Sequence, residues 1–237
     1  MQCRKAIALF SRVPQINRSN RDEPYASLTW EDLDTLFTAM LGDVVERVCS
    51  ADVADVFLYR DEKELSDDIF TRVRAKIEMC DLPKGAYAEQ IQQVIENIFA
   101  QHYDRIVVVL DNNPLTSQDL FKNVFHQLEY EDDCLVYGPT LEGKCYLMGM
   151  KSNHSLLFTM EEGDPMGTPD LLMGRLCKSN AFLFPTRLTY SLDSGFNLAR
   201  LKLDIEKSAG VDAVFPHRTH DLFKMLDKKY KTKKIPQ

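Results

Sequence analysis

The sequence predicts a single α/β domain with three layers, α/β/α, around a mainly parallel sheet. Short apolar runs alternate along the chain with longer segments of helical periodicity, as expected when strands alternate with crossover helices. Residues 106–110 are five consecutive apolar residues, which indicates a strand buried on both faces. The chain has no internal repeat and no linker rich in Gly, Ser or Pro. We therefore expect one domain over residues 1–237, with a core in about 5–207 and a terminal helix and basic tail in about 208–237.

Apolar spacing defines the elements expected in the first half of the chain. Between residues 33 and 48, apolar side chains recur at i, i+3, i+4 and i+7, the pattern of one buried helix face. Thr29 can cap this helix, because Asp32 follows three residues later in a capping-box arrangement. Strands are expected at residues 6–10, 53–59 and 76–80, with further helices at 66–74 and around 91–99.

Helix-start residues and short apolar runs alternate again in the second half. Thr116 can cap a helix whose inner face spans residues 120–128. Thr168-Pro169-Asp170 is a strong helix start, with a cap, a proline at the first helical position and an acid in the first turn. Strands are expected at residues 106–110, 135–137, 145–150, 182–184 and 188–190, and the last helices at 194–207 and 219–230.

Charge, hydropathy and cysteine spacing exclude several classes of function. The formal charge of −7 argues against binding to the phosphate backbone of nucleic acid. No apolar run approaches the ~18–20 residues that cross a bilayer, and the stretch at 6–10 is too short for a signal peptide. The six cysteines are too widely spaced for metal knuckles or CxxC motifs. We expect a cytoplasmic protein with reduced, mostly buried thiols and no membrane span.

A polar segment follows the strand expected at residues 106–110. It reads Asp111-Asn112-Asn113-Pro114, and open α/β sheets bind ligands beyond the carboxyl ends of their strands. Carboxylate and amide oxygens here could hold Mg²⁺ or Mn²⁺, which would neutralise a diphosphate. The alternative is a strand-ending turn, in which Asp and Asn side chains bond their own backbone. The tetrapeptide alone favours the turn.

Two further segments place charged side chains near strand ends. Glu142 and Lys144 flank Gly143 in a loop between two expected strands, where Glu142 could bind a metal or act as a base. A plain hairpin connection with solvated charges is the alternative, and the loop alone favours it. Asp193 precedes the helix expected at 194–207, and the sequence is equally consistent with a helix cap and with a ligand-binding role.

Several short motifs share their order and spacing with one known family. They are Ala8-Leu9-Phe10-Ser11-Arg12-Val13-Pro14, Asn112-Asn113-Pro114, Gly138-Pro139-Thr140-Leu141-Glu142-Gly143-Lys144, Leu157-Phe158 and Tyr190-Ser191-Leu192-Asp193. Over about residues 5–205 they resemble the GT-A-like nucleotide-diphospho-sugar transferase family associated with radical-SAM and selenium-domain proteins. The resemblance implies the Rossmann-like GT-A fold.

The same resemblance implies a metal-assisted transferase whose partner is a nucleotide or a nucleotide-sugar. Asp111 would hold the Mg²⁺ or Mn²⁺ ion and, with Asn112, contact the nucleotide. Arg12, Arg18 and Lys144 would also bind the nucleotide, because their positive charges would offset those of its phosphates.

The departures from the family's pattern fall on its chemistry. The metal-type Asp of the family is Asn112 here, the loop Asp is Glu142, and the second Gly of the loop is Lys144. Either the site is rebuilt with Asp111, Glu142, Lys144 and Arg18, or the fold persists in a binding protein without transfer chemistry. In an active site Glu142 and Asp193 would be the catalytic residues, which meet the acceptor or the metal. A nucleotidyltransferase is the enzymatic alternative, because one fold hosts several functions.

Overall fold

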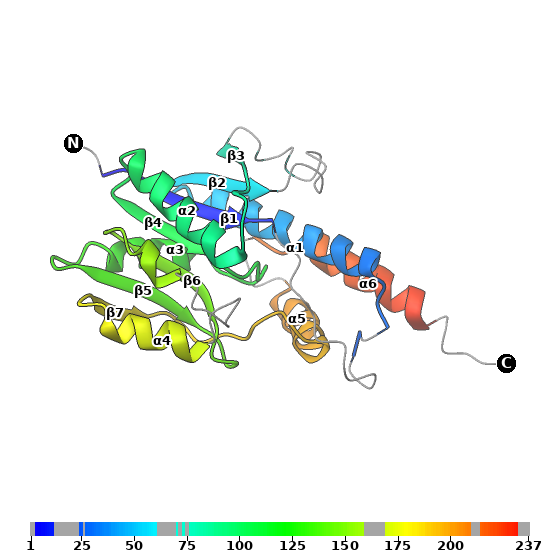
Figure 1. Cartoon of the computed structure of the whole chain (residues 1–237). Coiled ribbons are helices and arrows are strands. Elements are labelled where there is room, and N and C mark those ends of the chain that lie inside the picture. Colours follow the sequence, from blue (N-terminus) through cyan, green and yellow to red (C-terminus); the bar gives the residue numbers. More distant parts are fainter. Residues whose placement is uncertain are drawn as a thin grey trace.

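A seven-stranded sheet forms the centre of the computed structural model, which describes residues 3–11, 24–25, 27–60, 70, 73, 76–158, 169–209 and 214–231 (Figure 1). Along the sheet the order is β3-β2-β1-β4-β6-β5-β7. The strands are β1 (Lys5–Phe10), β2 (Asp55–Arg60), β3 (Ile77–Asp81), β4 (Arg105–Val109), β5 (Cys134–Pro139), β6 (Cys145–Met150) and β7 (Phe182–Pro185).

The sheet is mainly parallel, as predicted. Only β6 runs against its two neighbours, β4 and β5, whereas the other strand pairs are parallel. The chain builds outward from β1 to β2 and β3, and then returns to the opposite side of β1 with β4. The gap between β1 and β4 is therefore the topological switch point, where open α/β sheets bind their ligands.

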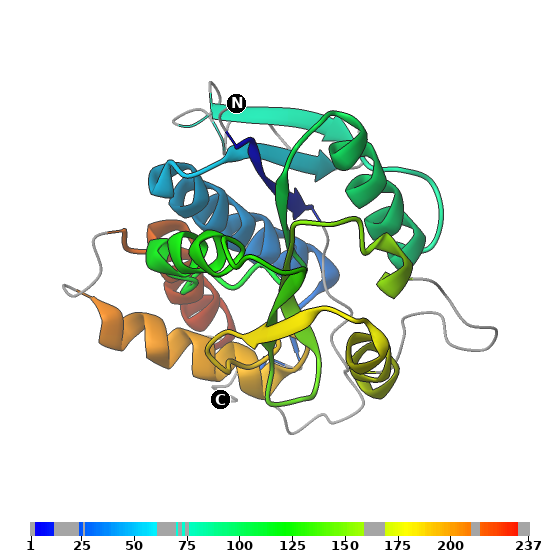
Figure 2. The same ribbon diagram turned by 90° about the vertical axis from the view of Figure 1, so that its left-hand side faces the viewer.

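Helices cover both faces of the sheet, which confirms the predicted three layers (Figure 2). On one face, α1 (Trp30–Ala51) and α3 (Gln118–Gln127) bury apolar side chains against alternate strand residues such as Ile7 and Leu9. On the other face lie α2 (Tyr87–Ala100), the short 3₁₀ helix η3 (Ser155–Phe158) and α4 (Pro169–Lys178). Because side chains alternate along a strand, each strand contributes to both cores.

A third apolar cluster lies beyond the sheet. Helices α5 (Gly195–Ser208) and α6 (His217–Lys231) pack around the first half of α1, where Leu36 and Phe223 are fully buried. In Figure 1, α6 runs alongside α1. The C-terminal helix α6 thus contributes Phe223 and Leu226 to this buried cluster.

The start of α1 shows why the local sequence defines this helix so clearly. The Thr29 hydroxyl accepts a hydrogen bond from Asp32 N at 3.1 Å, and the Asp32 carboxylate accepts one from Thr29 N at 3.1 Å. Both hydrogen bonds of the predicted capping box are therefore present, and they satisfy the N–H groups of Thr29 and Asp32 at the helix start.

Three predictions need correction. The cap of α3 is Ser117, not Thr116, because Thr116 N donates to Asn113 O at 3.0 Å and belongs to the preceding turn. Residues 188–190 form a single bridge, Thr140 to Thr189, and not a strand, because they run along the β5–β6 loop. All six cysteines have free thiols, but only Cys49 and Cys134 are buried, so the thiols are not mostly buried.

Two expected features concern residues whose structure is not described or only partly so. The helix expected at 66–74 falls mainly outside the described residues, as does Thr168, although α4 does begin at Pro169. Within the part of the chain that is described, no helix has both the length and the apolar character of a membrane span.

Candidate functional site

Four charged side chains gather at the carboxyl edge of the sheet, and we call them the rim cluster: Asp111, Glu142, Lys144 and Asp193. They come from the segment after β4, the β5–β6 loop and the segment before α5. The sequence singled out all four, and the structure brings them together. Arg12 and Arg18 lie outside the described residues.

The end of β4 is tied to both of its neighbouring strands. Asn112 donates from Nδ2 to the Phe10 carbonyl of β1 at 2.9 Å. On the other side, Leu110 N and Asp111 N donate to the Tyr146 carbonyl of β6 at 2.8 and 3.2 Å. Asp111 therefore leaves the sheet at the switch point in a fixed direction.

The turn predicted as the alternative for this tetrapeptide is present. Asn113 is buried, and its Oδ1 accepts a hydrogen bond from Leu115 N at 3.0 Å. Asn112 uses its amide nitrogen on β1, whereas its Oδ1 is buried without a hydrogen-bond partner among the described residues. The two asparagines thus shape the turn, and Asp111 is the side chain of this segment that joins the rim cluster.

Asp111 holds its proton unusually tightly. Burial raises the pKa of its carboxyl to about 7, and the charge of Asp193 adds to this effect. A hydrogen bond from Leu192 N at 3.2 Å and the charge of Lys144 oppose the rise in pKa without cancelling it. At neutral pH this carboxyl is therefore about half protonated.

Lys144 and Asp193 form an ion pair within the cluster. The Lys144 ammonium bonds Oδ2 of Asp193, and the Ser191 hydroxyl donates to Oδ1 of Asp193 at 2.7 Å. Burial alone would raise the pKa of Asp193, but the bonds from Lys144 and Ser191 lower it below its usual value. Asp193 is therefore ionised at neutral pH.

Glu142 ties the β5–β6 loop to the start of α5. Its two carboxylate oxygens accept hydrogen bonds from Ser191 N and from Asn197 Nδ2, both at 2.8 Å. Partial burial would raise the pKa of Glu142, but these bonds lower it. Gly143 turns the loop with a φ of 76°, a conformation that costs glycine little. The carboxylate of Glu142 is thus ionised and engaged on both oxygens.

The cap of α5 is the residue after Asp193. Ser194 accepts a hydrogen bond from Asn197 N at 3.2 Å on its hydroxyl. Asp193 therefore serves the rim cluster and does not cap the helix. Ser191, Ser194 and Asn197 were not predicted as site residues, although a serine directly before a helix is itself a capping signal.

The rim cluster does not fit the metal predicted at Asp111. Mg²⁺ and Mn²⁺ need several oxygen ligands around one point. Among the described residues, no group of three or more His, Cys, Asp or Glu side chains could hold a metal ion. Both oxygens of Glu142 and both of Asp193 already bond N–H, hydroxyl or ammonium donors.

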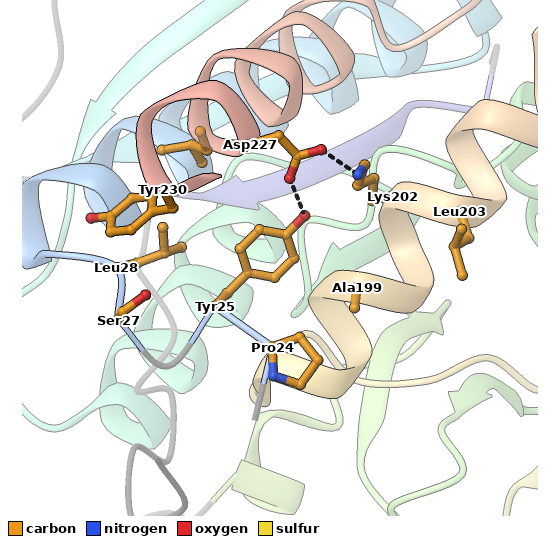
Figure 3. A pocket seen from close by; sticks show the side chains of 10 residues that line it. Pro24, Tyr25, Ser27, Leu28, Ala199, Lys202, Leu203, Asp227 and Tyr230 are labelled. Atoms are coloured by element: carbon orange, nitrogen blue, oxygen red, sulfur yellow. Dashed lines mark hydrogen bonds and ion pairs between the residues drawn. The ribbon is translucent and has the colours of Figure 1, made fainter. Parts of the chain in front are cut away.

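A separate hollow of about 370 Å³ lies between α5, α6 and the segment before α1 (Figure 3). Its wall is mainly apolar, with Leu203 and Leu226 among its lining residues. Asp227 bonds the Lys202 ammonium and accepts a hydrogen bond from the Tyr25 hydroxyl at 3.5 Å. The two charged side chains that line this hollow, Lys202 and Asp227, are therefore paired with each other. The rim cluster, in contrast, combines one ammonium group with three carboxyl groups.

The solved structures that share the fold of this chain include the following three. A proposed nucleotide-diphospho-sugar transferase from Desulfovibrio desulfuricans G20 superposes with a TM-score of 0.74 at 13% identity, over 99% of this chain and 100% of that one. A cytidylyltransferase from Leptospira borgpetersenii serovar Hardjo-bovis gives 0.54 at 14% identity, over 98% and 96%. CMP:2-keto-3-deoxy-manno-octonic acid synthetase complexed with CTP gives 0.53 at 11% identity, over 88% and 100%. These likenesses confirm the predicted nucleotide-diphospho-sugar transferase fold.

One family model also matches the sequence, whereas none of the curated proteins does. The model is described as "Uncharacterized protein conserved in bacteria (DUF2064)" and matches residues 44–165, which include Asp111, Glu142 and Lys144. The association with radical-SAM proteins stays a prediction. Because the match spans half of the sequence, the chain belongs to the DUF2064 family.

Proposed function

We propose that this chain binds a nucleoside-diphosphate sugar at the rim cluster and transfers the sugar to an acceptor. The observation that carries the proposal is the convergence of Asp111, Lys144 and Asp193 beside the β1–β4 switch point. Open α/β sheets bind ligands at that place. The proteins that share the fold are named for nucleotide or nucleotide-sugar chemistry, which supports this class of ligand.

The pKa values and contacts of Asp111, Asp193 and Glu142 support different roles for these three acids. Asp111, with a pKa of about 7, is suited to accept a proton from an acceptor hydroxyl at neutral pH. Asp193 and Glu142 have lowered pKa values and are engaged by protein donors. We therefore assign proton transfer to Asp111 and give Asp193 and Glu142, predicted as catalytic, the task of positioning Lys144 and the loop.

Lys144 would meet the phosphates, because an ammonium group supplies three donors and a full positive charge. Its side chain is half exposed, so a ligand can reach it. Arg12 and Arg18 stay predicted phosphate ligands, since they follow β1 along the chain. No step of this proposal passes through a metal ion.

A thermal-shift screen with UDP-, GDP-, CDP- and ADP-sugars, with and without Mn²⁺, tests the proposal. A nucleotide at ~100 times its Kd stabilises the folded state by about 2.7 kcal/mol. For a chain of this size that is a rise in Tm of about 5–10 °C. Asp111→Asn tests proton transfer: it should retain a shift relative to its own ligand-free Tm, and lose nucleotide release from the donor sugar. Asp119→Asn, on the exposed surface of α3, is the control.

The outcomes separate the candidate functions. A shift with release of a nucleoside diphosphate supports the transferase. A shift with release of pyrophosphate from a nucleoside triphosphate identifies a nucleotidyltransferase, and a shift without turnover identifies a binding protein. No shift with any nucleotide contradicts the proposal.

A further inference from the structure

We propose that the ammonium group of Lys144 is the resident cation of the rim cluster, so that a diphosphate binds there without a divalent metal ion. This inference rests on the proposed function and names the group that neutralises the phosphates. The donor groups of the cluster do not match the metal that the sequence predicts.

Both carboxylate oxygens of Asp193 already accept hydrogen bonds from side chains of this protein. A divalent ion between the two aspartates would need an oxygen of Asp193, but one oxygen bonds the Lys144 ammonium and the other bonds the Ser191 hydroxyl. A cation already occupies that side of the carboxylate. A metal ion would have to displace it, at the cost of leaving a positive charge without its partner.

The Lys144 ammonium is held in position by contacts at both ends of the residue. The Lys144 backbone is held on both sides: its N–H donates to the Thr140 hydroxyl at 3.0 Å, and its carbonyl accepts from Thr140 N at 2.8 Å. Asp193 then fixes the far end of the side chain. The cation is thus oriented before a ligand arrives, which reduces the entropy lost on binding.

The Lys144 ammonium also keeps donors with which it can bind a ligand. An ammonium group has three N–H donors, and among the described residues the side chain of Lys144 bonds Asp193 alone. Two donors therefore remain for phosphate oxygens. The side chain is 49% exposed, compared with 25% for Asp193, so a diphosphate meets the ammonium before the aspartate.

Two probes test this inference directly, with Lys144→Ala as the variant. Lys122→Ala is the matched control, because Lys122 is 53% exposed and also pairs with an aspartate, at 3.5 Å. The first probe is inorganic pyrophosphate in EDTA, measured by titration calorimetry. We expect wild type and Lys122→Ala to bind it equally with EDTA or with Mg²⁺, and Lys144→Ala to bind at least about tenfold more weakly in EDTA, a loss of ~1.4 kcal/mol.

The second probe is Mn²⁺ alone, measured by electron paramagnetic resonance without nucleotide. Removing the ammonium leaves Asp193 and Asp111 without their cation, so Lys144→Ala should bind Mn²⁺ at least about tenfold more tightly than wild type. Equal Mn²⁺ binding by wild type and variant would overturn the inference. So would pyrophosphate binding that needs Mg²⁺ in wild type, or no pyrophosphate binding at all. The nucleotide screen judges the proposed function separately, because a shift that requires Mn²⁺ would sustain the function and reject the role of Lys144.

Discussion

Asp43 and Asp111 both accept hydrogen bonds from backbone N–H groups, yet their surroundings differ. Asp43 of α1 is 3% exposed and accepts hydrogen bonds from Thr219 N at 2.8 Å, the Thr219 hydroxyl at 2.7 Å and the Arg218 guanidinium at 3.2 Å. Asp111 accepts one N–H bond, from Leu192 at 3.2 Å, and lies near two other carboxylates.

The difference separates a structural carboxylate from a candidate functional one. The charge of Asp43 is matched by donors, so it can hold α6 on α1 in a fixed position. Few donors compensate the negative charge of Asp111, so ionisation of this buried carboxyl is unfavourable and its pKa is raised to about 7. Strongly perturbed carboxyl groups are enriched at functional sites, because chemistry near neutral pH needs them.

The largest expected effect comes from Asp43→Ala. This change leaves Arg218 and the start of α6 without their buried partner, and loss of one member of a buried pair costs about 3–5 kcal/mol. Urea denaturation at 25 °C measures the loss in free energy of unfolding. Asp119→Ala, which removes an exposed partner of Lys122, should change this free energy by less than about 0.5 kcal/mol. A similarly small loss at Asp43 would remove the contrast between the two sites.

Asp111→Asn should have the opposite effect on stability and raise the free energy of unfolding at alkaline pH. The folded pKa of about 7 lies above the usual 3.8. The stability due to the protonated carboxyl is therefore complete below pH 3.8 and is lost as the pH rises through 7. Each pKa unit corresponds to ~1.36 kcal/mol, so the variant should exceed wild type by about 2–4 kcal/mol at pH 8.

The pH dependence provides the internal control for Asp111→Asn. Asparagine keeps an acceptor for Leu192 N and cannot ionise, so the gain should disappear near pH 4. Chemical denaturation of both proteins between pH 4 and pH 9 measures the difference. A gain that stays constant across this range would show that burial of the charge at Asp111 is not its cause.

Much of the fold was predictable because its signals are local. The capping box of Thr29 and Asp32 needs only residues three apart, and the apolar run at 106–110 marks the buried strand β4 by itself. The errors occurred where two neighbouring residues compete or where a short segment has no distinct pattern. Thr116 and Ser117 are both capping residues, and only the tertiary turn decides between them.

The site was predictable as a set of residue types but not as a network. Lys144 and Asp193 are 49 residues apart in the sequence, and Glu142 and Asn197 are 55 apart. No local pattern states which charges pair across such distances, because the pairing depends on how the β5–β6 loop meets the start of α5. The metal at Asp111 stays a prediction, and the sequence could not show that Lys144 and Ser191 already engage both carboxylate oxygens of Asp193.

Gly138→Ala tests whether the packing beneath the rim holds Asp111. A Cβ at Gly138 would lie 2.6 Å from the Tyr146 ring. The backbone carbonyl of Tyr146 accepts the hydrogen bond from Asp111 N. We expect a loss of about 1–3 kcal/mol in unfolding free energy from overpacking, with weaker nucleotide binding. Gly174→Ala in α4 is the control, because its Cβ would meet nothing within 4 Å and should stabilise the helix by about 0.5–1 kcal/mol. Urea denaturation measures both changes in unfolding free energy. A loss for Gly138→Ala together with a gain for Gly174→Ala would support the view that close packing at Gly138 holds the rim.

The smallest expected change in stability comes from removing a helix cap, either at the rim cluster or away from it. Ser194 caps α5 and Ser117 caps α3, each with a side-chain bond at 3.2 Å to the helix backbone. Replacement of either serine by alanine should cost about 1 kcal/mol of unfolding free energy. Only Ser194→Ala should also weaken nucleotide binding, because α5 carries Asn197, which holds Glu142 in the rim cluster. Calorimetric titration measures that loss, and equal nucleotide affinity in the two variants would show that the start of α5 plays no part in the site.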